Sequence, residues 1–132
     1  MRHHLLILLL VTTPLANAVT QSRWKEIGKT SAGNSVFVDP RSVKKDNGII
    51  TARIRVKFTT PVQQQNGDHW DASHHIAMFD CAKSRVAAKE TIYYSNEAAG
   101  KVSSRSTNKI PGFGPAIGGS MTQVALDYFC KK

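Results

Sequence analysis

The stretch that decides the fold is ITARIRVKFT, residues 50–59, in a chain of 132 residues. One side of this segment carries Ile50, Ala52, Ile54, Val56 and Phe58, and the other carries Thr51, Arg53, Arg55, Lys57 and Thr59. A strict period of two is typical of a half-buried β-strand whose apolar side faces the core. We expect Pro61 to end this strand.

Shorter strand-like segments lie on both sides of this stretch. Residues 75–81 and 88–94 follow it, and residues 100–105 are expected to form an edge strand. Before it, residues 24–27 begin an alternating pattern and residues 35–38 form a short apolar run. Asn47-Gly48 favours a hairpin turn, because both residues accept the positive φ that such turns require. The polar run at 63–68 is typical of a loop.

The apolar period changes near the C-terminus. Met121, Val124, Ala125, Tyr128 and Phe129 recur at the spacing of one helical stripe. Ser120 and Gln123 match a capping box at the start of that helix. The sequence therefore predicts an α+β fold, an antiparallel β-sheet of about five to six strands with a C-terminal helix packed on one face.

Cys81 and Cys130 are the only two cysteines in the chain. An even pair outside any thiol motif indicates one structural disulfide in an oxidising compartment. The bond would join the predicted helix to the strand that ends at Cys81. A metal site would need more ligands at close spacing.

Residues 1–18 have the pattern of a signal peptide. A short positive start precedes the apolar run at 5–11, and Ala16-Asn17-Ala18 places small residues before a cleavage site. The run is too short to span a bilayer, although an uncut N-terminal anchor is the alternative. We expect an exported protein, periplasmic, secreted or at the cell surface, with residues 19–132 forming a single domain and no transmembrane segment in the mature chain.

The formal net charge of the chain is +9. A small domain with this surplus attracts polyanions, which outside the cytoplasm include lipopolysaccharide, anionic lipid, extracellular DNA and sulfated glycans. The alternative is that the charge only maintains solubility. No pattern indicates a specific nucleic acid or an oligomeric state.

Catalytic and metal motifs are weak in this sequence. The glycine-rich run at 112–120 departs from phosphate-loop spacing at Ile117, and no serine lies in a G-x-S-x-G elbow. His74 and His75 are adjacent, so on a strand they would point to opposite faces and could not both ligate one ion. His69 and the neighbouring aspartates match no recognised ligand spacing. We expect no metal, no cofactor and no enzyme activity.

Arg53, Arg55 and Lys57 are the one patterned surface feature and the predicted binding row. Their spacing places them on one sheet face, where they could contact a row of anionic groups. A solvated strand face that discourages edge-on association is the alternative. Trp70, in an expected polar loop, is the better surface candidate for stacking, whereas Trp24 is expected in the core.

Several short motifs, together with the leader, occur in an order that resembles a known family. They are Trp24-Lys25-Glu26-Ile27-Gly28, Phe37-Val38-Asp39 followed by Ser42-Val43, Phe79-Asp80-Cys81, and Gly119-Ser120 before Cys130. This pattern resembles the surface-adhesin protein E family, small exported proteins of Gram-negative bacteria. The resemblance implies an antiparallel sheet with a C-terminal helix, a Cys81–Cys130 disulfide, and framework roles for Asp39 and Ser120.

The founding member of that family is an adhesin for host matrix proteins. The resemblance therefore implies an exported, non-catalytic binding protein that docks on a host extracellular-matrix protein or an anionic polymer. The alternative hypothesis, of a different class, is a periplasmic structural or accessory subunit of an envelope assembly that docks through a sheet edge.

Overall fold

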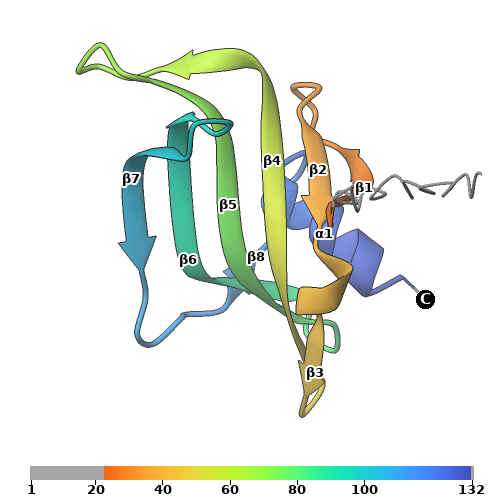
Figure 1. The fold of residues 1–132 in the computed structure, drawn as a ribbon. Helices are drawn as coiled ribbons and strands as arrows, with labels where there is room; N and C mark the ends of the chain where they lie inside the picture. Colours follow the sequence, from red (N-terminus) through yellow and green to blue (C-terminus); the bar gives the residue numbers. More distant parts are fainter. Residues whose placement is uncertain (1–22, 132) are drawn as a thin grey trace, which may run out of the picture.

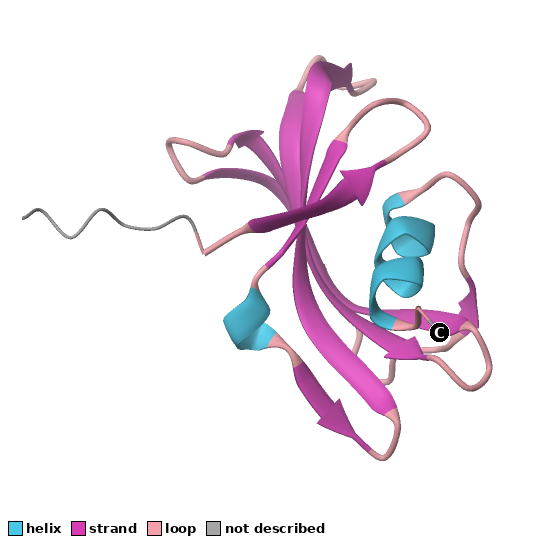
Figure 2. Cartoon of the chain, turned by 90° about the vertical axis from the view of Figure 1, so that its right-hand side faces the viewer, coloured by secondary structure: helices cyan, strands magenta, loops and turns pink. Residues whose placement is uncertain are grey.

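The computed structural model describes residues 23–131, which form a curled antiparallel sheet with one α-helix inside the curl (Figures 1 and 2). The elements are β1 (Lys25–Lys29), β2 (Ser35–Val38), the 3-10 helix η1 (Pro40–Ser42), β3 (Lys44–Asp46), β4 (Ile49–Gln63), β5 (His69–Asp80), β6 (Arg85–Asn96), β7 (Lys101–Thr107), β8 (Gly114–Pro115) and α1 (Met121–Phe129). The main strand order is β1-β2-β4-β5-β6-β7, while β3 pairs with β4 and β8 with β6. The predicted α+β class is confirmed, and the predicted signal peptide lies outside the described residues.

Strand β4 has the expected two-sided pattern. Ile50, Ala52, Ile54 and Val56 are buried, and Phe58 is half-buried. Ile50, Ala52 and Ile54 join the core cluster around Phe79 and the helix residues Ala125 and Leu126. Burial of this apolar cluster between the sheet and α1 stabilises the fold. We call the sheet face toward α1 the inner face, and the opposite face, which carries Arg53, Arg55 and Lys57, the outer face.

The prediction that Pro61 ends this strand is wrong, because β4 continues to Gln63. The pairing of β4 with β5 is irregular between Lys57 and Val62, and Pro61 lies inside that interval. A proline there removes no regular ladder hydrogen bond, so the sheet tolerates it. The strand resumes its pairing at Val62 opposite Trp70.

The hairpin between β3 and β4 confirms the predicted turn. Asn47 and Gly48 have φ values of 50° and 78°, and Asp46 pairs with Ile49 on either side of them. Two consecutive positive φ angles are the requirement of a type I′ turn, whose twist matches that of the flanking strands.

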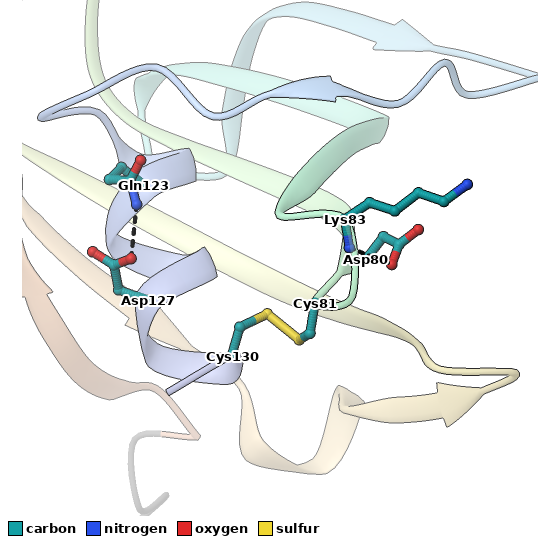
Figure 3. Close-up of a disulfide and its surroundings, with 6 residues drawn as sticks. All are labelled: Asp80, Cys81, Lys83, Gln123, Asp127 and Cys130. Carbon is teal, nitrogen blue, oxygen red and sulfur yellow. Dashed lines mark hydrogen bonds between the residues drawn. A yellow bond between two sulfur atoms is a disulfide. The ribbon is translucent and has the colours of Figure 1, made fainter. Parts of the chain in front are cut away.

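The predicted disulfide is present between Cys81 and Cys130, with a Cα–Cα distance of 5.1 Å. Figure 3 shows that it links the end of α1 to the turn after β5. A Cβ on Gly28 of β1 would lie 2.8 Å from Val124 Cγ1 of α1, so this strand needs glycine at the contact. The helix is therefore held against the inner face by packing at one place and a covalent bond at another.

The predicted capping box is wrong, although the helix begins where expected. Ser120 makes no side-chain capping bond, and its hydroxyl donates to the Ile117 carbonyl at 2.6 Å. Gln123 Nε2 donates to Asp127 Oδ1 at 2.7 Å (Figure 3). The Ser120 hydroxyl also lies 2.7 Å from Thr122 Oγ1, so its side chain is engaged in local bonds of a kind open to any serine. In residues 23–131, no helix is long and apolar enough to cross a membrane.

Candidate binding surfaces

The predicted row of Arg53, Arg55 and Lys57 lies on the outer face, but its three members differ in environment. Arg55 forms two hydrogen bonds with Glu97 in the turn between β6 and β7, one of them from Nε to Oε2 at 2.7 Å. Its guanidinium also lies 5.0 Å from the centre of the Phe37 ring. The bond to Glu97 raises the pKa of Arg55. Arg55 is thus engaged within the protein.

Glu97 is the acceptor for a second outer-face side chain. His74 Nε2 lies 2.6 Å from Glu97 Oε2, and the Glu97 backbone N–H donates to Asp71 Oδ1 at 3.1 Å. Burial alone would raise the pKa of Glu97, but hydrogen bonds from Arg55 and His74 outweigh it and lower the pKa. We call the set Arg55, His74 and Glu97 the outer ion cluster.

Lys57 and Arg53, the other two members of the row, differ in whether a carboxylate lies nearby. Lys57 Nζ lies 3.9 Å from Asp71 Oδ2, with its side chain 45% exposed. Arg53 is exposed, and its guanidinium forms no ion pair with the part of the chain that the structure describes. Two of the three predicted cations therefore face carboxylates, and one faces solvent.

Arg53 lies in a groove of about 600 Å³ that the sequence did not reveal. Its charged lining residues are Arg41, Lys44, Arg53 and Lys89, with Asp39 and Asp46. Asp39 is already committed, because it accepts the Arg41 backbone N–H at 3.1 Å and lies 3.8 Å from Arg23. None of the four cations forms an ion pair within residues 23–131. We call this surface the basic groove.

The cations of the basic groove come from η1, β3, β4 and β6. The sequence gives little indication that these cations lie together, because only those of the β3–β4 hairpin are close to one another along the chain. Lys89 enters at an irregularity where the β5–β6 register shifts between Ile76 and Ala77, opposite Glu90 and Ala88. A bulge redirects one side chain, and its position could not be inferred from a period of two.

Trp70 lies within β5 and not in the predicted polar loop, so that structural prediction is wrong. Its ring stacks on Tyr93 with centroids 3.8 Å apart and planes at 17°. Its indole N–H donates to Ser103 Oγ at 3.0 Å. The half-buried Trp70 is thus fixed between β6 and β7. Trp24 is also half-buried, with its ring centre 5.2 Å from that of His74.

The two adjacent histidines lie on opposite faces, as the strand geometry predicted. His74 joins the outer ion cluster, while His75 Nε2 lies 2.8 Å from Ser73 Oγ on the inner face. The other ring nitrogen of His75 faces Thr91 Oγ1 at 3.4 Å and not a carboxylate. This serine–histidine pair therefore lacks the third group that orients a catalytic base. Residues 23–131 contain no group of three or more His, Cys, Asp or Glu side chains placed to hold a metal.

Comparisons with known proteins connect this architecture to a family. The structure resembles crystal form II of Haemophilus influenzae protein E, with a TM-score of 0.55, 13% identity, and coverage of 83% of this chain and 88% of that one. It also resembles protein E from non-typeable Haemophilus influenzae, with a TM-score of 0.53, 13% identity, and coverage of 86% and 78%.

These structural likenesses, at such low identity, establish a shared fold. The search of curated proteins gave no significant match. The sequence itself matches the family described as Surface-adhesin protein E over residues 24–131. Since that match spans most of the chain, this protein belongs to the surface-adhesin protein E family.

Proposed function

We propose that this protein is an exported, non-catalytic adhesin that docks on an anionic partner, a host matrix protein or an anionic polymer. Family membership supports the adhesive role, and the net charge of +9 supports the choice of an anionic partner. The observation that carries the proposal is the basic groove, where Arg41, Lys44, Arg53 and Lys89 have no ion-pair partner within residues 23–131.

The proposal narrows the predicted binding set of Arg53, Arg55, Lys57 and Trp70 to one member that docks directly. An arginine free of internal partners can form a two-pronged contact with sulfate, phosphate or carboxylate. Arg55 would have to leave Glu97 to do so, and Trp70 would have to leave Tyr93. Arg53 therefore contacts the partner. Arg55, Lys57 and Trp70 have structural roles through their contacts with Glu97, Asp71 and Tyr93.

Charge reversal tests this assignment on the mature chain. The first variant combines Arg53→Glu and Lys89→Glu. The matched control combines Lys83→Glu and Lys109→Glu, which make the same change in net charge at exposed positions outside the groove. Binding is measured on a heparin oligosaccharide and on immobilised matrix proteins at two salt concentrations.

We expect the groove variant to bind at least about tenfold more weakly and the control to change far less. Binding by the unchanged protein should weaken as salt rises, because exposed charges are screened. If both variants lost the same binding affinity, the effect would come from net charge alone, and the groove assignment would be overturned. Circular dichroism and melting temperature verify that both variants fold.

A second candidate function, an accessory subunit of a periplasmic envelope assembly, has one observation in its favour. Strand β7 pairs with β6 along one side, and its other side has no strand partner among residues 23–131. A partner strand could extend the sheet there. Lys101 and Arg105 on this strand oppose such pairing, since edge charges discourage it. Salt-insensitive capture of one envelope protein, lost on substituting β7 residues, would favour this candidate.

A further inference from the structure

A pocket of about 380 Å³ opens on the inner face beside the start of α1. Phe58, Ser73 and Tyr93 of the sheet line it, together with Ala32 from the turn after β1 and Met121 from α1. The volume falls within the range of small-molecule sites, about 300–1,000 Å³. We call it the inner pocket, and the adhesive proposal makes no use of it.

The inner pocket carries no formal charge. None of its lining residues is Lys, Arg, Asp or Glu, although the chain has a net charge of +9. The imidazole in its wall, His75, is neutral at pH 7, because burial, and to a smaller extent nearby His74, lowers its pKa to about 4. An ionised group entering this pocket would lose water without meeting an opposite charge. The pocket therefore selects against ions.

The lining favours a flat ring. Tyr93 is held in place by the stacked Trp70, with ring centres 3.8 Å apart, and it meets the His75 ring edge-on at 85°. Phe58 adds another aromatic ring and Met121 a thioether, both of which pack well against aromatic groups. The Tyr93 hydroxyl makes no hydrogen bond within the described part of the chain, so it stays available to a ligand.

The walls of the inner pocket are fixed before any ligand arrives. The Ser31 backbone N–H donates to the Gly119 carbonyl at 2.8 Å and joins the two rim loops. A Cβ on Gly119 would meet Ser31 Oγ at 2.8 Å, so this approach requires glycine. Ser73 and Thr91 hold the His75 ring on either side. A pocket with fixed walls pays little ordering cost on binding.

We propose that the inner pocket binds an uncharged small molecule that contains an aromatic ring. The lack of charge excludes organic ions, and the ring-lined wall favours aromatic over purely aliphatic ligands. This site lies on the opposite sheet face from the basic groove and is independent of the adhesive proposal. The protein thus has a second binding activity with a different ligand class.

A matched pair of fluorescent probes tests the proposal on the full mature chain. N-phenyl-1-naphthylamine is uncharged, whereas 8-anilinonaphthalene-1-sulfonate has the same ring system with one added sulfonate. We expect saturable binding of the neutral probe, at least about tenfold tighter than that of the sulfonate. A basic protein without such a pocket would prefer the anion, so tighter binding of the sulfonate, or no saturable binding of the neutral probe, would overturn the proposal.

Two single substitutions test whether the neutral probe binds in the inner pocket. Ala32→Arg introduces a charge at the exposed rim of the pocket, and Ala98→Arg makes the same change at an exposed turn elsewhere. We expect Ala32→Arg to weaken binding of the neutral probe at least about tenfold and Ala98→Arg to leave it unchanged. Equal affinities of the two variants would overturn the site. Displacement of the probe by decan-1-ol more readily than by naphthalene-1-methanol would overturn the aromatic assignment.

Discussion

The two faces of the sheet are made by the same strands, but charged side chains gather on the outer face and an uncharged pocket lies on the inner one. On β4, Arg53 and Arg55 point to the outer face, while Val56 and Phe58 point to the inner one. The outer face holds the outer ion cluster and the basic groove, and the inner pocket is lined without a formal charge. Net charge alone would describe the whole molecule as basic. The alternation of side chains along each strand instead places charged and uncharged surfaces on opposite faces of the sheet.

His74 and His75 show this separation at neighbouring positions of β5. His74 lies 2.6 Å from Glu97, with the Trp24 and Tyr94 rings beside it, while His75 packs among Ser73, Thr91 and the Tyr93 ring. His75 is placed where burial disfavours its charged form, and its pKa falls to about 4. Identical side chains one residue apart thus contribute to different chemistries.

Removal of the disulfide should break the inner face first and have the largest effect. With Cys81→Ser and Cys130→Ser combined, the free energy of unfolding should fall by about 4 kcal/mol, the chain-entropy value for a loop of this size. Hydrogen exchange should quicken in α1 while β4 and β5 stay protected, because the helix loses its covalent link. Urea unfolding measures the total, and a loss under about 1 kcal/mol would contradict this role for the disulfide.

Acid should weaken the fold through His75. The folded pKa is about 4 against an ordinary 6.5, so the unfolded chain binds the extra proton between these values. The free energy of unfolding should therefore rise by about 3 kcal/mol from pH 4 to pH 6.5 on this account.

His75→Gln should flatten that rise, and His69→Gln at an exposed position is the control. Unfolding by urea at several pH values gives the slopes. The same slope in the His75 variant and the unchanged protein would contradict the origin assigned to it.

Loss of the outer ion cluster should cost less than loss of the disulfide. Glu97→Gln leaves Arg55 without its counter-charge, and we expect about 2 kcal/mol, reduced from the value for a fully buried pair because solvent reaches both side chains. The pKa of Glu97 is lowered, so this contribution is present above its ordinary value of 4.5 and lost as pH falls. A double-mutant cycle with Arg55→Gln measures the coupling, and Glu26→Gln at an exposed position is the control.

The smallest expected change in stability separates Arg53 from Arg55 within the outer face. Arg53→Gln should alter the free energy of unfolding by less than about 0.5 kcal/mol, because its side chain is exposed and unpaired. Arg55→Gln should cost clearly more. If the two variants lose the same stability, the division of the row into a docking and a structural member is wrong.

Local patterns in the sequence predicted the parts of the fold that depend on local geometry. The alternation at residues 50–59 places each β4 side chain on the correct face, and Asn47-Gly48 supplies the turn before it. The same alternation predicts that His74 and His75 diverge. Pro61 misled because its tolerance depends on an irregular stretch of pairing with β5.

The candidate sites depend on contacts between distant segments, and the sequence could not provide these. Arg55 meets Glu97 across 42 positions, through the register of three strands and the turn after them. The basic groove needs a bulge that turns Lys89 outward, and the inner pocket needs the loop of Gly119 to meet that of Ser31. The order of residue types along the chain does not predict the register between these strands or the bulge at Lys89.

The most direct test of the adhesive account is an amide chemical-shift titration of residues 19–132 with a heparin oligosaccharide. The account predicts that the largest shifts fall in the basic groove, at Arg41, Lys44, Arg53 and Lys89, while Ala32 and Met121 at the inner pocket stay unmoved. Shifts concentrated along the β7 edge or spread evenly over all exposed lysines would contradict it.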